Sequence, residues 1–265
     1  GNTMVLGGTD GDDRLVAGHA DDDTVWGDGG NDYIDGGNGN DTLKGGLGND
    51  QVFGGSGQDR LNGGDGNDYL DGGTGTDWVE FDGGAAVNVD LTAGTATGQG
   101  TDTILNIENI LGSSFADTLK GSATNNKIWA GNGDDTIIAT LGADIISGDG
   151  GIDLITFAQL GSAAIVNLAT GTYTAGTASG TLSSIENVTG TALADTITGD
   201  ANDNVIDGGN GSDILNGGAG VDTYKFSGTV GAPYNQGAFI NLTTGTSVTY
   251  GATDTISNFE NVIAS

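Results

Sequence analysis

Cysteine is absent from this 265-residue chain, and proline and histidine occur once each. Without cysteine the chain has no disulfide framework. A catalytic zinc site needs several ligands, usually histidines, and the chain has neither enough of them nor an H-E-x-x-H sequence. We interpret the single histidine, His19, as a surface residue, and we expect no enzymatic activity.

Basic residues are also scarce: the chain has six Lys and Arg and 36 acidic residues, which give a formal net charge of -30. Nucleic-acid binding requires a basic surface, so we expect no nucleic-acid partner. An anionic membrane surface would repel the chain. No apolar run approaches the roughly 20 residues of a spanning helix, so we expect no transmembrane segment. No signal peptide opens the sequence.

Glycine and aspartate are abundant instead, and they are periodic. Glycine accounts for 53 residues, and 32 of the acids are aspartate. From Gly27 to Glu80 the chain repeats the unit G-G-x-G-x-D-x-U-x, in which U is apolar, and two looser copies precede this run. The sixth position is aspartate in all eight copies: Asp13, Asp23, Asp32, Asp41, Asp50, Asp59, Asp68 and Asp77. The eighth position is Leu15, Val25, Ile34, Leu43, Val52, Leu61, Leu70 and Val79.

The repeat returns twice after non-repetitive connectors. "NIENILG" precedes sixth positions Asp117, Asn126, Asp135, Asp144 and Asp153, and "SIENVTG" precedes Asp195, Asn204, Asp213 and Asp222. We therefore divide the chain into repeat blocks 1–81, 112–157 and 190–226, β-rich connectors 82–111 and 158–189, and a last connector, 227–265, that starts a further block. We expect no helix in the connectors, and we interpret the chain as a segment of a longer array.

The unit has a direct physical interpretation. Six glycine-rich residues suit a tight turn, and x-U-x forms a strand of three residues with one inward side chain. Two units make one coil of 18 residues, and stacked coils bury the U residues in a thin column. Aspartates on one edge would then lie about 4.8 Å apart and repel one another. A hard cation removes this repulsion, and six to eight carboxylate and carbonyl oxygens are the ligands that Ca²⁺ takes.

These residues resemble the RTX proteins, the secreted calcium-binding nonapeptide-repeat family of Gram-negative bacteria. The restart I-E-N-x-x-G followed by D-x-L, N-x-I and G-x-G-x-D also resembles the C-terminal domain of serralysin-type proteases. The resemblance implies an all-β fold, a right-handed parallel β-roll with calcium ions between its turns. It also implies export through a type I secretion channel in unfolded form, with folding outside the cell.

The same resemblance implies the ligands of each ion. One turn supplies the carbonyls of positions two and four and its aspartate; the turn 18 residues later supplies the carbonyls of positions one and three and its aspartate. The implied carbonyl donors are Gly36, Gly37, Asn38, Gly39, Gly45, Gly46, Leu47, Gly48, Gly54, Gly55, Ser56, Gly57, Gly63, Gly64, Asp65, Gly66, Gly208, Gly209 and Gly211. The implied aspartate pairs are Asp13 with Asp32, Asp23 with Asp41, Asp32 with Asp50, Asp41 with Asp59, Asp50 with Asp68, Asp59 with Asp77, Asp117 with Asp135, Asp135 with Asp153, and Asp195 with Asp213. They predict about nine Ca²⁺ ions.

Some positions depart from this pattern. Asn126 and Asn204 replace aspartate. The partners of Asn126 are Glu108 and Asp144, and those of Asn204 are Glu186 and Asp222. We expect weak or absent ions there, and we favour asparagine turns without metal. Asp77 ends the first run, so we expect it to share an ion with Asp59 alone.

Aromatic residues occupy outward or terminal positions. We expect a cation–π contact between Arg60 and Trp78, which lie one coil apart. The other outward aromatics are Trp26, Tyr33, Tyr69 and Trp129; we interpret them as surface residues, with a sugar-binding face as the alternative. We expect Phe81, Phe157 and Phe226 to face inward and to close the apolar column.

Two functional contexts fit the sequence. The first is a structural calcium-binding segment of an extracellular or cell-surface bacterial protein, of adhesin or surface-layer type. The alternative is a calcium-dependent export and folding module of a secreted enzyme, of protease, lipase or epimerase type, whose catalytic domain lies outside this chain. Calcium is the partner in both, and neighbouring repeats, cell-surface polysaccharide or self-assembly are further possibilities.

Overall fold

The computed structural model describes residues 3–227, 239–249 and 252–264. Every regular element in these residues is a β-strand, and none forms a helix that could cross a membrane. The chain divides into two compact units, 1–135 and 136–265, a division that falls inside the predicted second repeat block. Part of the last connector lies outside the described residues, and the predicted block boundaries stay a prediction.

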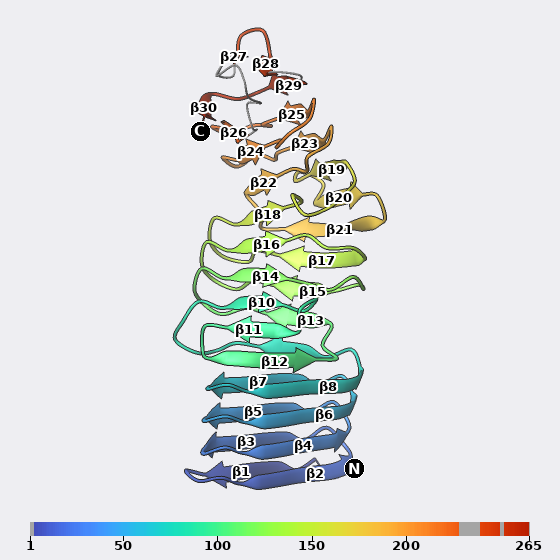
Figure 1. The fold of residues 1–265 in the computed structure, drawn as a ribbon, viewed down its shortest axis with the longest axis vertical. Helices are drawn as coiled ribbons and strands as arrows, with labels where there is room; N and C mark the ends of the chain where they lie inside the picture. The colour runs from blue at the N-terminus through green and yellow to red at the C-terminus, as the bar shows by residue number, and fades with distance from the viewer. Residues whose placement is uncertain (1–2, 228–238, 250–251, 265) are drawn as a thin grey trace, which may run out of the picture. The chain divides into compact units, whose positions relative to one another are not determined.

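The first unit contains two sheets of mainly parallel strands. One has the order β1 (Val5–Thr9), β3 (Thr24–Gly29), β5 (Thr42–Leu47), β7 (Arg60–Asp65), β9 (Trp78–Glu80), β13 (Asn109–Leu111) and β15 (Lys127–Trp129). The other has the order β2 (Arg14–Ala20), β4 (Tyr33–Asn38), β6 (Gln51–Gly57), β8 (Tyr69–Gly75), β12 (Thr101–Leu105), β11 (Thr95–Thr97), β10 (Asn88–Asp90) and β14 (Thr118–Lys120). Successive strands of the first block alternate between the sheets, so two repeats form one coil (Figure 1).

The register confirms the predicted coil of 18 residues. Thr42 pairs with Arg60, and Gln51 pairs with Tyr69. Between β2 and β4 the offset is 19 at Arg14, which pairs with Tyr33, and returns to 18 at Ala20, which pairs with Asn38. A bulge in β2 absorbs the one extra residue between the first two copies.

Strands of the first block are longer than the sequence predicts. They contain six or seven residues in β4 to β8, against an expected three. The glycine positions themselves join the ladder, since Gly46 pairs with Gly64 and Leu47 pairs with Asp65. In the later blocks the typical strand is the expected three residues, as in β14 and β15.

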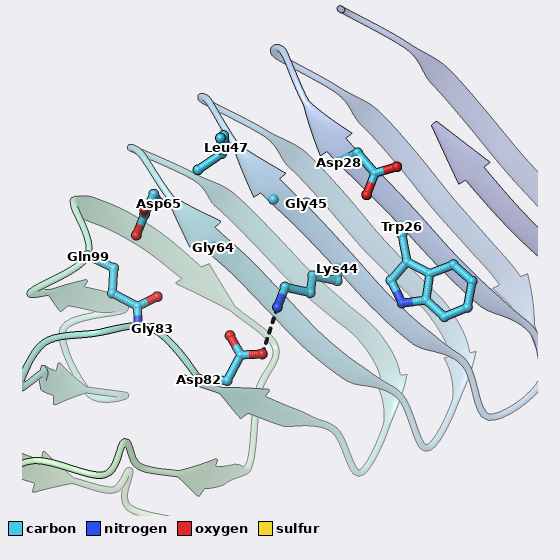
Figure 2. Close-up of a pocket in the computed structure, with 11 residues that line it drawn as sticks. Trp26, Asp28, Lys44, Gly45, Leu47, Gly64, Asp65, Asp82, Gly83 and Gln99 are labelled. Carbon is cyan, nitrogen blue, oxygen red and sulfur yellow. Dashed lines mark hydrogen bonds and ion pairs between the residues drawn. The ribbon is translucent and has the colours of Figure 1, made fainter. Parts of the chain in front are cut away.

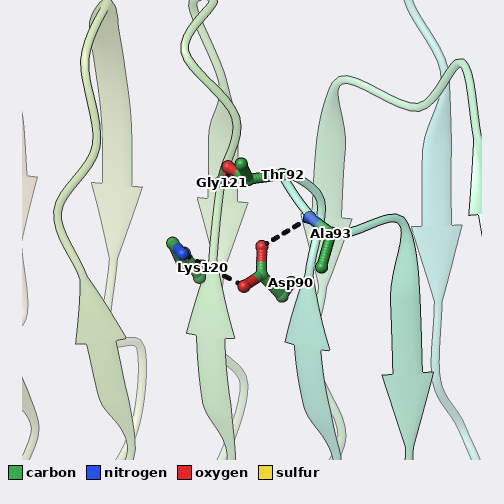
Figure 3. A network of polar contacts seen from close by, with 5 residues as sticks. All are labelled: Asp90, Thr92, Ala93, Lys120 and Gly121. Atoms are coloured by element: carbon green, nitrogen blue, oxygen red, sulfur yellow. Dashed lines mark hydrogen bonds and ion pairs between the residues drawn. The ribbon is translucent and has the colours of Figure 1, made fainter.

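The first connector is β-rich, as predicted, but its strands do not all pair in parallel, contrary to what the predicted parallel β-roll implied. β10, β11 and β12 form an antiparallel meander, and its two outer strands pair in parallel with β14 and β8. Lys120 Nζ lies 3.0 Å from Asp90 Oδ2, and Asp90 Oδ1 accepts the N–H of Ala93 (Figure 3). The meander therefore extends the sheet without leaving a gap in its ladder.

The second unit repeats this architecture. One sheet has the order β17 (Ala143–Ser147), β21 (Ala178–Ser183), β20 (Thr172–Ala175), β19 (Ala164–Asn167), β23 (Thr196–Thr198), β25 (Ile214–Asn216), β29 (Ala252–Ser257), β28 (Thr246–Thr249) and β27 (Phe239–Asn241). The other has the order β16 (Thr136–Ile138), β18 (Leu154–Thr156), β22 (Asn187–Thr189), β24 (Val205–Asp207), β26 (Thr223–Phe226) and β30 (Asn261–Ala264). Two antiparallel meanders, β19 to β21 and β27 to β29, interrupt its parallel pairing.

The core is the predicted thin column of U residues. Ile34, Val52 and Leu61 are fully buried, and the other U residues from Val25 to Val79 are at most 1% exposed. Phe81, Phe157 and Phe226 are buried as predicted, and Phe157 packs edge-on against Tyr173 of the second connector. Parallel pairing, the 18-residue coil and this column confirm the β-roll fold class.

Candidate calcium-binding turns

The sixth-position aspartates form buried columns at the edges of the coils. Those from Asp23 onward are at most 3% exposed. From Asp23 to Asp77, Oδ1 of each accepts a backbone N–H from the preceding coil: Asp50 from Asp32 at 2.7 Å, and Asp68 from Asp50 at 2.8 Å. One carboxylate oxygen therefore holds adjacent coils in register.

In eight of these aspartates the other oxygen has no donor. Oδ2 is buried and lacks a hydrogen-bond partner in Asp23, Asp32, Asp41, Asp50, Asp59, Asp68, Asp77 and Asp213. A Cβ atom added at Gly45 would overlap both Asp50 Oδ2 and the carbonyl oxygen of Gly63, so these two acceptors face the same small space. A buried acceptor without a donor costs about 1–3 kcal/mol, and more when it is charged. A space bounded only by acceptors suits a hard cation.

Burial and mutual repulsion disfavour the charged form of these side chains. Burial raises the pKa of Asp41, Asp50, Asp59, Asp68 and Asp77 to about 6. For Asp50, the backbone N–H of Asp32 lowers the pKa, while the carboxylates of Asp68 and Asp32 raise it further. Burial likewise raises the pKa of Asp213 to about 7. The column thus contains negative charge that the protein alone does not neutralise.

Backbone carbonyls from the glycine positions lie beside this column. A Cβ atom added at Gly64 would overlap the Gly46 carbonyl oxygen, and one added at Gly66 would overlap that of Gly48. The position-three carbonyl of Leu47 accepts the N–H of Gly30 at 2.9 Å. In the described residues no three acidic or histidine side chains converge on a metal position, so carboxylates alone do not supply the six to eight oxygens that Ca²⁺ takes. Which carbonyls coordinate stays a prediction.

Two further acidic residues extend the aspartate columns, one on each side of the coil; the repeat had placed Glu108 at a sixth position but had not revealed Asp102. Asp102 Oδ1 accepts the N–H of Asp68 at 3.0 Å, and Glu108 Oε2 accepts the N–H of Asp77 at 2.9 Å. Glu108 therefore follows Asp77 in its column, and the sharing of an ion by Asp77 with Asp59 alone stays a prediction. In the second unit Asp254 and Glu260 take the same role. The segments "TDTIL" and "TDTIS" contain the D-x-U signal that would have identified both aspartates.

The two asparagine turns satisfy their own polar groups. Asn126 Nδ2 donates to the Glu108 carbonyl at 2.6 Å, and Asn204 Nδ2 donates to the Glu186 carbonyl at 2.9 Å. The amide oxygens accept N–H groups of Ser122 and Asp200, both at 2.8 Å. Amide donors therefore lie where the aspartate turns present acceptors, which supports turns without metal.

Two of the predicted pairs join residues of different units, and a third lies within the second unit. Asp135 with Asp153, and Asn126 with Asp144, join residues of the two units, and they stay predictions. Asp222 lies within the second unit, where its Oδ1 accepts the N–H of Asn204 at 2.9 Å.

The outer face of the first unit carries aromatic contacts and a groove. Arg60 lies over the Trp78 ring at 5.9 Å, as predicted, and Trp78 stacks on Trp129 with centroids 4.4 Å apart. The groove has a volume of about 310 Å³, and the Lys44–Asp82 ion pair crosses it (Figure 2). Its lining contains no serine, cysteine or histidine.

Fold and turns together define a calcium-binding β-roll. The model of the RTX calcium-binding nonapeptide repeat matches residues 7–43, 18–52, 44–79, 111–146, 121–155 and 189–224, more than half of the chain. The chain belongs to this family. No curated protein matches it.

Proposed function

We propose that this chain is a structural segment of a secreted or cell-surface bacterial protein, of adhesin or surface-layer type, that folds on binding calcium after export. The observation that carries the proposal is the series of buried Oδ2 atoms without donors, which includes Asp32 to Asp77 without interruption. The implied ligands are these carboxylates and the neighbouring glycine-position carbonyls. Repeats and β-rich connectors occupy the described chain.

Calcium supplies the free energy that the thin core lacks. Each coil buries few apolar side chains, which do not offset the entropy of ordering a coil of about 18 residues. Repulsion along the aspartate column opposes folding further. A cation that binds only the folded turns makes its binding free energy part of the folding free energy. Low calcium inside the cell keeps the chain unfolded for export, and higher calcium outside folds it.

Far-ultraviolet circular dichroism of the purified chain tests this proposal. In excess chelator we expect little β signal; titration with Ca²⁺ should produce a cooperative gain. Mg²⁺ should substitute poorly, because it demands a tight octahedral geometry and retains its water. Equal β signal in chelator and in calcium would contradict the proposal. A protease or other hydrolase motif in the upstream coding sequence would favour the second context, a tail of a secreted enzyme.

A further inference from the structure

The turns form two classes that differ at their second position. Ten repeat turns have a positive φ at this residue, and in seven of them the sixth-position Oδ2 is buried without a partner; φ is, for example, 119° at Gly46 and 106° at Gly55. The other five of these seven are Asp28, Gly37, Gly64, Gly73 and Gly209. The sixth-position Oδ2 lacks a partner in all seven, which end at Asp32, Asp41, Asp50, Asp59, Asp68, Asp77 and Asp213. We name these the open turns.

Five other turns have Thr9, Ser113, Ser122, Thr191 or Asp200 at the second position, none with positive φ. In each, the backbone N–H of that residue donates to the sixth-position side chain at 2.5–2.8 Å. The sixth-position residues are Asp13, Asp117, Asn126, Asp195 and Asn204. We name these the closed turns.

The second-position side chain completes the closed turn. Ser113 Oγ donates to Asp117 Oδ1 at 2.7 Å, and Thr191 Oγ1 donates to Asp195 Oδ1 at 2.8 Å. Thr191 Oγ1 also accepts the N–H of Leu193, the fourth position, at 3.0 Å. In an open turn this N–H points to the next coil instead, as Gly48 donates to the Asp65 carbonyl at 2.8 Å. The hydroxyl thus adds one more donor to the carboxylate, and it also helps to fix the turn.

We propose that the backbone conformation of the second position decides which turns bind calcium: open turns, with positive φ there, take the ion, and a second-position N–H bonded to the sixth-position side chain excludes it from the closed turns. This inference rests on the proposed function, which assigns calcium to the aspartate column. Both oxygens of Asp117 and Asp195 already accept hydrogen bonds. A cation would have to displace these donors, whereas an open turn presents an acceptor that has none.

The expected ion count changes accordingly. Both aspartates carry an unpartnered Oδ2 in five of the nine predicted pairs: Asp23 with Asp41, Asp32 with Asp50, Asp41 with Asp59, Asp50 with Asp68, and Asp59 with Asp77. The pairs that begin at Asp13, Asp117 and Asp195 each contain a closed turn. Calcium is therefore concentrated in residues 23–77.

Matched substitutions to asparagine test this assignment by bound calcium per chain after equilibrium dialysis. Asp50→Asn should lose about two ions, because Asp50 lies in two pairs of open turns. Asp117→Asn and Asp195→Asn should lose none, and both should fold, since Asn126 already occupies a closed turn. Asp90→Asn, in the connector, is the control outside the column. A loss of about one ion from Asp117→Asn, as the repeat pattern alone implies, would overturn the inference.

A second pair of variants tests whether a closed turn can be converted into an open turn that binds calcium. Ser113→Gly permits positive φ and removes the hydroxyl, so it should gain about one ion. Ser113→Ala removes only the hydroxyl and keeps the N–H bond to Asp117, so it should gain none. An unchanged count in Ser113→Gly would also overturn the inference. Failure of the proposed function gives a different result in the same measurement, because the parent chain itself would then bind no calcium.

Discussion

Aspartate at the sixth position has two functions within one carboxylate. Oδ1 of Asp50 bonds to the coil before it, while Oδ2 lies buried beside the Gly63 carbonyl without a donor. Removing this side chain therefore affects both coil register and charge. Glycine has an equally specific role, because the carbonyls of one coil lie directly against the glycine Cα atoms of the next.

Alanine substitutions at two glycines should distinguish the effect of this close packing on stability from the effect of replacing any glycine. Gly48 has φ 123°, and an added Cβ would overlap the Gly30 carbonyl oxygen. Gly84 has no heavy atom within 4 Å of an added Cβ. Gly48→Ala should lower the free energy of unfolding in calcium by more than about 1 kcal/mol, because φ is positive there. Gly84→Ala should change it by less than about 0.5 kcal/mol.

Urea denaturation of both variants and the parent, in saturating calcium, measures this difference. Equal free energies of unfolding for the two variants would show that the coils do not approach as closely as Gly48 and the Gly30 carbonyl indicate.

Within each strand, inward and outward side chains differ in burial. The inward Leu61 of β7 is fully buried, whereas the outward Leu47 of β5 is 62% exposed. Connectors preserve this alternation: Asp102 and Ile104 of β12 are buried, and Thr101 and Thr103 are exposed. Antiparallel meanders can therefore be inserted without breaking the apolar column.

The two leucines provide a matched test of the column. Leu61→Ala should lower the free energy of unfolding by about 2–5 kcal/mol, since it leaves a cavity in a column without alternative packing. It should also raise the calcium concentration needed for half-folding. Leu47→Ala should stay within about 0.5 kcal/mol of the parent, because its side chain is exposed and its carbonyl is retained. Calcium titrations followed by circular dichroism measure both effects, and similar midpoints for the two variants would contradict a packed column.

For the whole molecule, charge links folding to pH as well as to calcium. The formal net charge is -30, and burial places the pKa of the column aspartates about two units above that of an exposed aspartate. Between these values the folded state binds more protons than the unfolded state. By linkage, stability of the calcium-free fold therefore rises as pH falls through about 6 and is lost as pH rises.

The chain in chelator should consequently gain β signal on acidification from about pH 7 to about pH 5. In subsaturating calcium the affinity should fall over the same window, because protons compete for the same carboxylates. Circular dichroism and calcium binding, measured in parallel across this range, test both directions. A calcium-free chain that loses β signal between these pH values would show that the column is not the source of instability at neutral pH.

The nine-residue period by itself determined the coil, the apolar column and the aspartate column. Val25 and Leu43 are buried, and Asp32 lies one coil from Asp50, because a strict repeat places equivalent residues at equivalent positions. It also identified Asn126 and Asn204 as exceptions.

Tertiary structure decided what the period does not encode. Asp102 joins the column 34 residues after Asp68, because the meander between them brings β12 beside β8. Glycine positions extend the strands of the first block because adjacent coils pair there. Ser113 closes its turn through the hydrogen bonds of its N–H and hydroxyl to Asp117. Such pairings depend on backbone angles and on contacts between distant segments. A local sequence pattern therefore specifies which residues repeat. It does not specify which of their oxygens remain available to a cation.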